Sequence, residues 1–243
     1  MGRHLTWDGC VNARDLGGIP TADGRMTRWG AVVRSDSVDR LTDDGWRALK
    51  AHGIRTIVDL RNDVERDAAP YSCELDVVHV AIEDDTDEEF VRRWRPFSTP
   101  HYYAAALERW PGRAAAAVRA VARARPGGVV VHCGLGRDRT GLVTMLLLTL
   151  AGVAPEDIAD DYELSAGRLP PLDSVALLSS ASLVNPRTPR QLEDDLATEC
   201  RRRAARSDRD AVLATLASLD VAACLRTAGL DDDDLTAIRT RLV

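Results

Sequence analysis

The segment over residues 129–152 limits the fold of this chain most strongly, because three structural signals follow one another in it. It reads VVVHCGLGRDRTGLVTMLLLTLAG. Residues 129–132 form a short apolar run typical of a buried strand, Gly134 and Gly136 then indicate a turn, and a helical pattern occupies residues 140–151. A buried strand that leads through a glycine-rich turn into a helix is typical of a parallel sheet covered by helices.

Three further runs rich in β-branched residues support this fold class. They occupy residues 31–33, 54–60 and 75–82, and helical patterns lie between the strands at residues 42–52 and 104–125. Near-continuous apolar strands that alternate with helices indicate a sheet that is buried on both faces. The sequence therefore predicts an α/β fold with a central, mostly parallel sheet flanked by helices.

The last third of the chain shows no strand pattern and contains several prolines. We expect one domain over residues 1–243, with an α/β catalytic core at 1–165 and a C-terminal helical extension at 166–243. Within this extension, residues 166–211 are interpreted as a helical cover over the sheet and not as a second domain. The acidic run at residues 231–234 is interpreted as a helix start, because carboxylates stabilise a helix N-terminus.

Composition excludes several classes of function. The chain has 32 lysine and arginine residues against 38 aspartate and glutamate residues, a formal net charge of −6, so no nucleic-acid partner is expected. The longest apolar run, residues 142–154, is too short to cross a ~30 Å hydrocarbon layer. The first residues lack the apolar stretch of a signal peptide. We therefore expect a cytoplasmic protein without a membrane span.

The five cysteines are scattered, odd in number and free of any CxxC pair, which argues against a disulfide framework and a zinc site. The five histidines show no ligand spacing either, so no metal ion and no cofactor are expected. A single cysteine in a special local setting remains a candidate nucleophile. The cysteines are Cys10, Cys73, Cys133, Cys200 and Cys224.

Cys133 has such a setting, because five residues separate it from Arg139 in the turn before the helix. A short loop that turns into a helix directs several backbone N–H groups into one concavity, which binds a tetrahedral oxyanion. Arg139 can hold two phosphate oxygens with its planar guanidinium group. A helix N-terminus and a guanidinium group both favour the thiolate form of a cysteine. The spacing therefore predicts covalent catalysis through a phosphocysteine.

Two other residues of this segment, Thr140 and Arg137, each have two possible roles. Thr140 either donates a hydrogen bond to the thiolate or caps the helix. Arg137 either faces a second anionic group of the substrate or points to solvent. His132 is expected to orient the loop by hydrogen bonding. Residues just past the other strands, Arg61 among them, lie at the sheet edge where ligands bind in such folds.

The loop HCGLGRDRTG resembles the signature of the cysteine-dependent protein tyrosine phosphatase superfamily. The rest of the chain resembles a bacterial branch that has an NxRDLGG entry motif and an HCxxGKDRTG loop. The matching segments are NARDLGG (12–18), RSDSVDRLTDDG (34–45), GIRTIVDLRNDVER (53–66), ADDYELS (159–165) and CLRTAGLDDDDLTAIRTRL (224–242). The resemblance thus covers nearly the whole chain.

This resemblance implies a phosphatase-like α/β fold and a metal-independent phosphomonoester hydrolase. Cys133 would be the nucleophile and Arg139 the phosphate clamp. The phosphate loop would consist of Gly134, Leu135, Gly136, Arg137 and Asp138, and the site would be lined or braced by Asn12, Arg14 and Asp15.

The superfamily also needs a general acid for the leaving group. The candidates are Asp84 and Asp85, past the third predicted strand, and Asp138 in the phosphate loop. A carboxylate next to a bound dianion has a raised pKa and keeps its proton, which favours Asp138. The alternative is that Asp138 pairs with an arginine and holds the shape of the loop.

Three departures from the branch leave the substrate open between a phosphoprotein and a small phosphometabolite. Arg137 replaces a lysine, Leu135 replaces a small residue, and Ala13 replaces an aromatic residue of the NxRDLGG motif. Protein tyrosine phosphatase-like activity is the first interpretation, and a nucleotide or sugar phosphatase is the alternative. A non-catalytic phosphate-binding pseudophosphatase is the second alternative, and the presence of both Cys133 and Arg139 argues against it.

Overall fold

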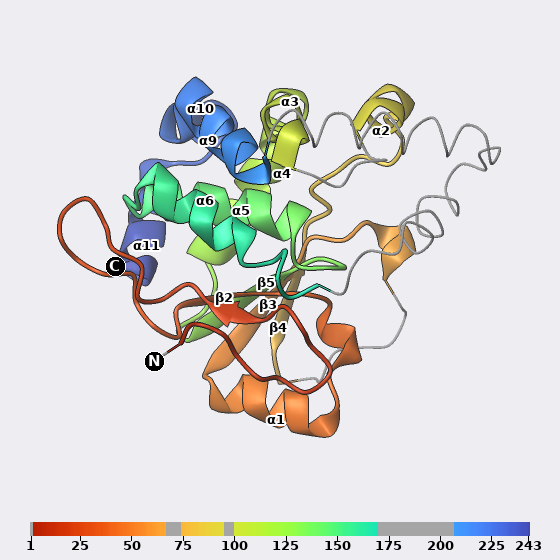
Figure 1. The fold of residues 1–243 in the computed structure, drawn as a ribbon, viewed down its shortest axis with the longest axis vertical. Helices are drawn as coiled ribbons and strands as arrows, with labels where there is room; N and C mark the ends of the chain where they lie inside the picture. The colour runs from red at the N-terminus through yellow and green to blue at the C-terminus, as the bar shows by residue number, and fades with distance from the viewer. Residues whose placement is uncertain (1, 67–73, 95–99, 170–206) are drawn as a thin grey trace.

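The computed structural model describes residues 2–66, 74–94, 100–169 and 207–243, and its centre is a five-stranded sheet (Figure 1). The four longer strands are parallel to one another, and β1 pairs antiparallel with β2. The predicted α/β fold with a mostly parallel sheet is therefore confirmed. In spatial order the strands are β1 (Arg14–Asp15), β2 (Val32–Ser35), β5 (Gly128–His132), β3 (Ile54–Asp59) and β4 (Asp76–His79).

Strand β1 is absent from the sequence prediction. It has only two residues, both charged, so it carries no apolar alternation that a periodicity argument could detect. It forms because the NARDLGG segment lies along β2, where Arg14 pairs with Arg34.

The register of the parallel strands positions the cysteine. Ser35 of β2 and Asp59 of β3 both pair with His132 of β5. The carboxyl ends of three neighbouring strands therefore meet at one edge of the sheet, and Cys133 follows directly at that edge.

Helices cover both faces of the sheet. Figure 1 shows α1 (Asp43–Ala51) below the sheet and most of the other helices above it. These other helices are α2 (Glu88–Trp94), α3 (Tyr103–Arg109), α4 (Pro111–Ala122), α5 (Asp138–Leu150), α6 (Pro155–Glu163), α9 (Asp208–Ser218), α10 (Val221–Thr227) and α11 (Asp232–Leu242). Short 3-10 turns in the described ranges are η1 (Val38–Arg40), η2 (Asp63–Glu65) and η4 (Pro100–Tyr102).

The core lies on both sides of β5. Val129 and Val131 pack into the larger apolar cluster with α5, and Val130 packs into the smaller cluster with α1. Every residue of α5 except Arg139 and Thr149 is buried. The position of the N-terminus of α5 is therefore fixed by core packing, and this N-terminus follows the phosphate loop.

Two helices begin or end at other residues than the sequence predicts. The helical pattern over residues 104–125 is divided into α3 and α4, because Pro111 occupies the first turn of α4 and cannot continue the preceding helix. The helix expected to start at Thr140 starts at Asp138.

The C-terminal helices agree with the sequence prediction where they are described. The Asp231 side chain accepts a hydrogen bond from the Asp234 N–H at 2.7 Å, so the acidic run begins α11 as expected. The helical cover expected over residues 166–211 falls mostly on residues 170–206, which lie outside the described residues. No helix in the described ranges is long and apolar enough to cross a membrane.

Candidate active site

The phosphate loop connects β5 to α5 and lies against the end of β2. Gly136 adopts a φ of +66°, and a Cβ atom there would lie 2.5 Å from backbone atoms of Ser35 and Asp36. Only glycine tolerates both this conformation and this close approach. The two strand ends therefore determine where the loop begins its turn into α5.

The loop carbonyl groups all accept hydrogen bonds from outside the loop. The Gly134 oxygen accepts from the Ser37 N–H at 3.1 Å, and the Leu135 oxygen accepts from Asn12 Nδ2 at 2.9 Å. The oxygens of Gly136 and Arg137 both accept from Arg34 Nη2, at 2.9 and 3.2 Å.

This bonding directs the loop N–H groups to the other side. In a trans peptide the N–H points opposite to the preceding C=O, and no cis peptide occurs in the described residues. The N–H groups of the four peptides whose carbonyls are bonded therefore face away from the bracing side chains. This is the arrangement that an oxyanion-binding nest needs, and α5 adds the positive end of its dipole.

One buried carboxylate holds the bracing arginines. Asp161 of α6 lies 2.7 Å from Arg34 Nη1, 3.1 Å from Arg14 Nε and 2.6 Å from Arg3 Nη1. Burial alone raises the pKa of Asp161, but the Arg14 and Arg34 charges outweigh it and hold this pKa well below its usual range. Arg14 in turn donates to Asn12 Oδ1 at 2.9 Å. Asn12 and Arg14 therefore brace the loop.

Asp15 lies away from the loop. Its carboxylate accepts from the N–H groups of Gly17 and Gly30 and lies 2.7 Å from His52 Nε2. Consecutive residues of a strand point to opposite faces, so Asp15 cannot share the position of Arg14. The structure brings Asn12 and Arg14 to the loop and leaves Asp15 at the amino end of β2.

Arg139 carries two acidic neighbours beside the loop. Glu65 bonds both of its terminal nitrogens, with Nη2 2.7 Å from Oε1 and Nη1 in contact with Oε2, and Glu83 lies 3.8 Å from Nε. Burial lowers the pKa of Arg139, but these carboxylates outweigh burial and raise this pKa well above its ordinary value. A Cβ atom on Gly134 would lie 3.9 Å from Arg139 Nη2, so the guanidinium group adjoins the loop.

Glu65 was not among the sequence candidates. The signal that could have found it is its place in the GIRTIVDLRNDVER segment, where Oε2 also accepts from the Asn62 N–H at 3.0 Å. Asp161, in the ADDYELS segment, was missed in the same way.

Asp138 differs from the other acidic candidates. Burial raises its pKa, while Tyr162 Oη and Arg137 Nε both donate to Oδ1, at 2.8 and 3.2 Å. Among the described residues, none donates a hydrogen bond to the other carboxylate oxygen of Asp138, Oδ2. Arg137 is only 6% exposed, so its charge faces Asp138 and not solvent. Tyr103 Oη donates to the Asp138 backbone oxygen at 2.6 Å.

Asp84 and Asp85 are bonded elsewhere. Asp84 accepts from the N–H and hydroxyl of Thr86, which lower its pKa, and from Arg113 of α4 at 2.9 Å. Asp85 accepts from the side-chain amide of Asn62.

Three further candidates lie at the carboxyl edge of the sheet. Arg61 is buried and bonds Asp59 Oδ2 at 2.8 Å and Ser37 Oγ at 3.2 Å, so it ties β3 to the chain after β2. His132 Nδ1 lies 3.2 Å from the Cys133 oxygen, and burial lowers the pKa of this histidine. The buried Thr140 hydroxyl has no hydrogen-bond partner in the described part of the chain, which leaves it free to bond a thiolate.

The variant Asp161→Asn should unfold more easily. It leaves Arg14 and Arg34 buried without a counter-charge, which costs about 3–5 kcal/mol of the free energy of unfolding. The control is Asp160→Asn. Asp160 is exposed, and its one ion pair among the described residues is with Arg209, so a loss of at most about 1 kcal/mol is expected. Urea unfolding at neutral pH measures both, and equal losses would contradict the role of Asp161.

The same carboxylate predicts a pH dependence of stability. The folded pKa of Asp161 lies below its unfolded value. The free energy of unfolding that this carboxylate contributes is therefore fully present above its unfolded pKa of ~3.9. It is lost as the pH falls toward the folded pKa.

Comparison with known proteins agrees with this geometry. A family model described as "Tyrosine phosphatase family" matches residues 5–243. A protein of Cupriavidus necator named as a tyrosine-protein phosphatase is 31% identical over 75% of this chain and 71% of its own. A tyrosine-protein phosphatase of Nostoc commune is 31% identical over 56% of this chain and 48% of its own length. A triple specificity protein phosphatase of Mycobacterium tuberculosis is 27% identical over 68% of this chain and 70% of its own length. The chain is a phosphatase that belongs to the tyrosine phosphatase family.

Proposed function

We propose that this enzyme hydrolyses phosphotyrosine-type monoesters through a phosphocysteine formed on Cys133, without a metal ion. The observation that carries the proposal is the outward bonding of the four loop carbonyls, which turns the N–H groups of the loop toward one bound oxyanion. Arg139 adjoins this loop and supplies a planar pair of donors for two phosphate oxygens.

In the first step the Cys133 thiolate attacks phosphorus and the bond from phosphorus to the leaving-group oxygen breaks. Asp138 gives its proton to that oxygen, so the alcohol or phenol leaves neutral. In the second step Asp138 takes a proton from water, the water oxygen attacks phosphorus, and the sulfur–phosphorus bond breaks to release inorganic phosphate and the thiolate. The Thr140 hydroxyl is suited to stabilise the thiolate in both steps.

The environment of the acidic residues supports Asp138 as the acid. Its burial favours the protonated carboxyl, and the hydrogen bonds that described residues donate to this carboxyl both go to Oδ1. Hydrogen bonds from Thr86 keep Asp84 ionised. Arg113 also holds Asp84 on the side of α4.

The departures from the family pattern give little support to a small metabolite. Ala13 is fully buried in the core near α1, together with Val33 and Leu49, so the missing aromatic ring does not alter the phosphate loop. Arg137 is directed at Asp138, so its charge is already engaged. The relatives from Cupriavidus necator and Nostoc commune are both named for tyrosine phosphatase activity.

Replacement of the nucleophile tests the mechanism. Cys133→Ser should lower the turnover of p-nitrophenyl phosphate, measured with a metal chelator present, on the order of a thousandfold or more. It should still bind vanadate, because the nest consists mainly of backbone. Cys10→Ser is the matched control: burial raises the pKa of Cys10 to about 12, so its loss should leave turnover unchanged. Retained activity in Cys133→Ser would refute the phosphocysteine.

A substrate panel tests the specificity. Phosphotyrosine peptides should give a higher kcat/KM than sugar phosphates and nucleotides under the same conditions. A preference for one of the small phosphates would instead support the metabolite reading and leave the mechanism untouched.

The pH dependence tests the acid. The Tyr162 hydroxyl stabilises the ionised form of Asp138, so Tyr162→Phe should raise the pKa of Asp138. Because the first step needs protonated Asp138, the fall of kcat at alkaline pH should then move to higher pH. Tyr103→Phe removes a bond to the Asp138 backbone oxygen only and should leave the profile in place. A profile that is the same in Tyr162→Phe as in the wild type would exclude Asp138 as the acid.

A further inference from the structure

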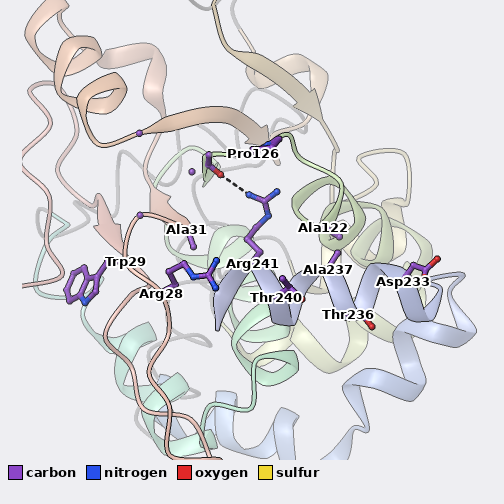
Figure 2. A pocket seen from close by; sticks show the side chains of 14 residues that line it. Arg28, Trp29, Ala31, Ala122, Pro126, Asp233, Thr236, Ala237, Thr240 and Arg241 are labelled. Carbon is purple, nitrogen blue, oxygen red and sulfur yellow. Dashed lines mark hydrogen bonds between the residues drawn. The ribbon is translucent and has the colours of Figure 1, made fainter.

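An open cavity lies at the amino ends of the strands, at the edge of the sheet opposite to Cys133 (Figure 2). Its volume is about 790 Å³. The turns before β2, β3 and β5 form one side of it, through Gly30, Gly53 and Gly127, and α11 forms the other. The cavity is therefore separated from the phosphate loop by the length of β5.

Two guanidinium groups enter this cavity without a carboxylate partner in the described part of the chain. The Arg28 side chain has no hydrogen bond or ion pair there, and only its backbone N–H is bonded, to the Leu242 oxygen at 2.6 Å. Arg241 donates to the backbone oxygens of Gly127, at 2.8 Å, and Ala124. Figure 2 shows both guanidinium groups among the residues that line the cavity, with Arg241 bonded to the wall.

The arginines at the opposite edge of the sheet have counter-charges that Arg28 and Arg241 lack in the described part of the chain. Arg34, Arg61 and Arg139 are all bonded to carboxylates. The carboxylate that lines the cavity, Asp233, lies at the far end from Arg241 in Figure 2. Burial also lowers the pKa of Arg241, so an anion close to it would relieve an unfavourable charge.

The remaining surface of the cavity suits an apolar body. Ala31, Ala122, Pro126 and Ala237 line it. A Cβ atom on Gly53 would meet nothing within 4 Å, so the backbone on this side borders open space. The two arginines thus lie beside small apolar side chains and bare backbone.

We propose that this cavity binds an organic anion whose phosphate, phosphonate or carboxylate group is held by Arg28 and Arg241. Its apolar or planar body lies against Ala122, Pro126 and Ala237. This second site is independent of the catalytic proposal, because it shares no residue with the phosphate loop or the groups that brace it.

The test uses phenylphosphonate, whose carbon–phosphorus bond the enzyme cannot hydrolyse as a monoester. It is titrated into the full chain carrying Arg139→Ala, which removes the clamp of the active site, and amide shifts are followed by two-dimensional NMR. Wild-type protein saturated with vanadate serves as a second background in case that variant does not fold. Saturable shifts of the Gly30, Gly53 and Gly127 amides are expected.

The charge is tested by Arg28→Glu in the same background. This side chain has no described partner, so the fold is preserved, and the affinity should fall about tenfold or more. Arg25→Glu is the matched control, because Arg25 is exposed and its partner in the described ranges is Asp23; the affinity should not change. Shifts that are absent, that stay confined to the phosphate loop, or that survive Arg28→Glu would overturn the site.

The apolar contact is tested with inorganic phosphate, which has the anionic group alone. It should bind more weakly than phenylphosphonate at the same amides. Equal affinities would overturn the assignment of an organic ligand.

Discussion

The buried carboxylate of Asp161 is the interaction on which the active site depends. It lies on α6, yet it holds Arg34 at the end of β2 and Arg14 on β1. Arg34 then bonds two carbonyl groups of the phosphate loop, and Arg14 positions Asn12, which bonds a third. Three charged groups buried together are stable only while each has its partner. The loop is therefore held in one shape before any substrate arrives.

This arrangement determines which groups of the loop are bonded within the protein and which are left for a ligand. Side chains outside the loop occupy its carbonyl groups, and the N–H groups are left for the oxyanion. Glu65 and Glu83 hold Arg139 beside the loop. Asp138 bonds Tyr162 and Arg137 instead, and burial raises its pKa. Under the proposed mechanism, Arg139 and the loop N–H groups bind the dianion, and Asp138 supplies the proton.

The sequence was most informative where a local pattern carries the physics. Apolar periodicity located the four parallel strands, and the spacing of Cys133 and Arg139 located the loop between β5 and α5. Strand β1 is not predicted, because its two charged residues form no alternating apolar pattern. The alanine-rich stretch over residues 104–125 resembles one helix, but Pro111 divides it into two.

Ion pairs between residues far apart in the chain could not be predicted from the sequence. Nothing local distinguishes Asp161 from the exposed Asp160 beside it, and their difference arises only when three distant segments pack together. Asp15 was grouped with Arg14 because they share a motif, although adjacent strand residues face opposite ways. That Arg28 and Arg241 lie at the amino edge of the sheet with no carboxylate partner among the described residues is likewise visible only in three dimensions.

The most direct test of the account is to trap the covalent intermediate. The enzyme is mixed with excess p-nitrophenyl phosphate, quenched in acid within milliseconds, digested and examined by mass spectrometry for the phosphorylated residue. The account predicts a phosphoryl group on Cys133, in a larger amount in Asp138→Asn, in which no carboxylate activates water for the second step. A phosphoryl group on another residue, or turnover with no phosphorylated enzyme at any time in either protein, would contradict it.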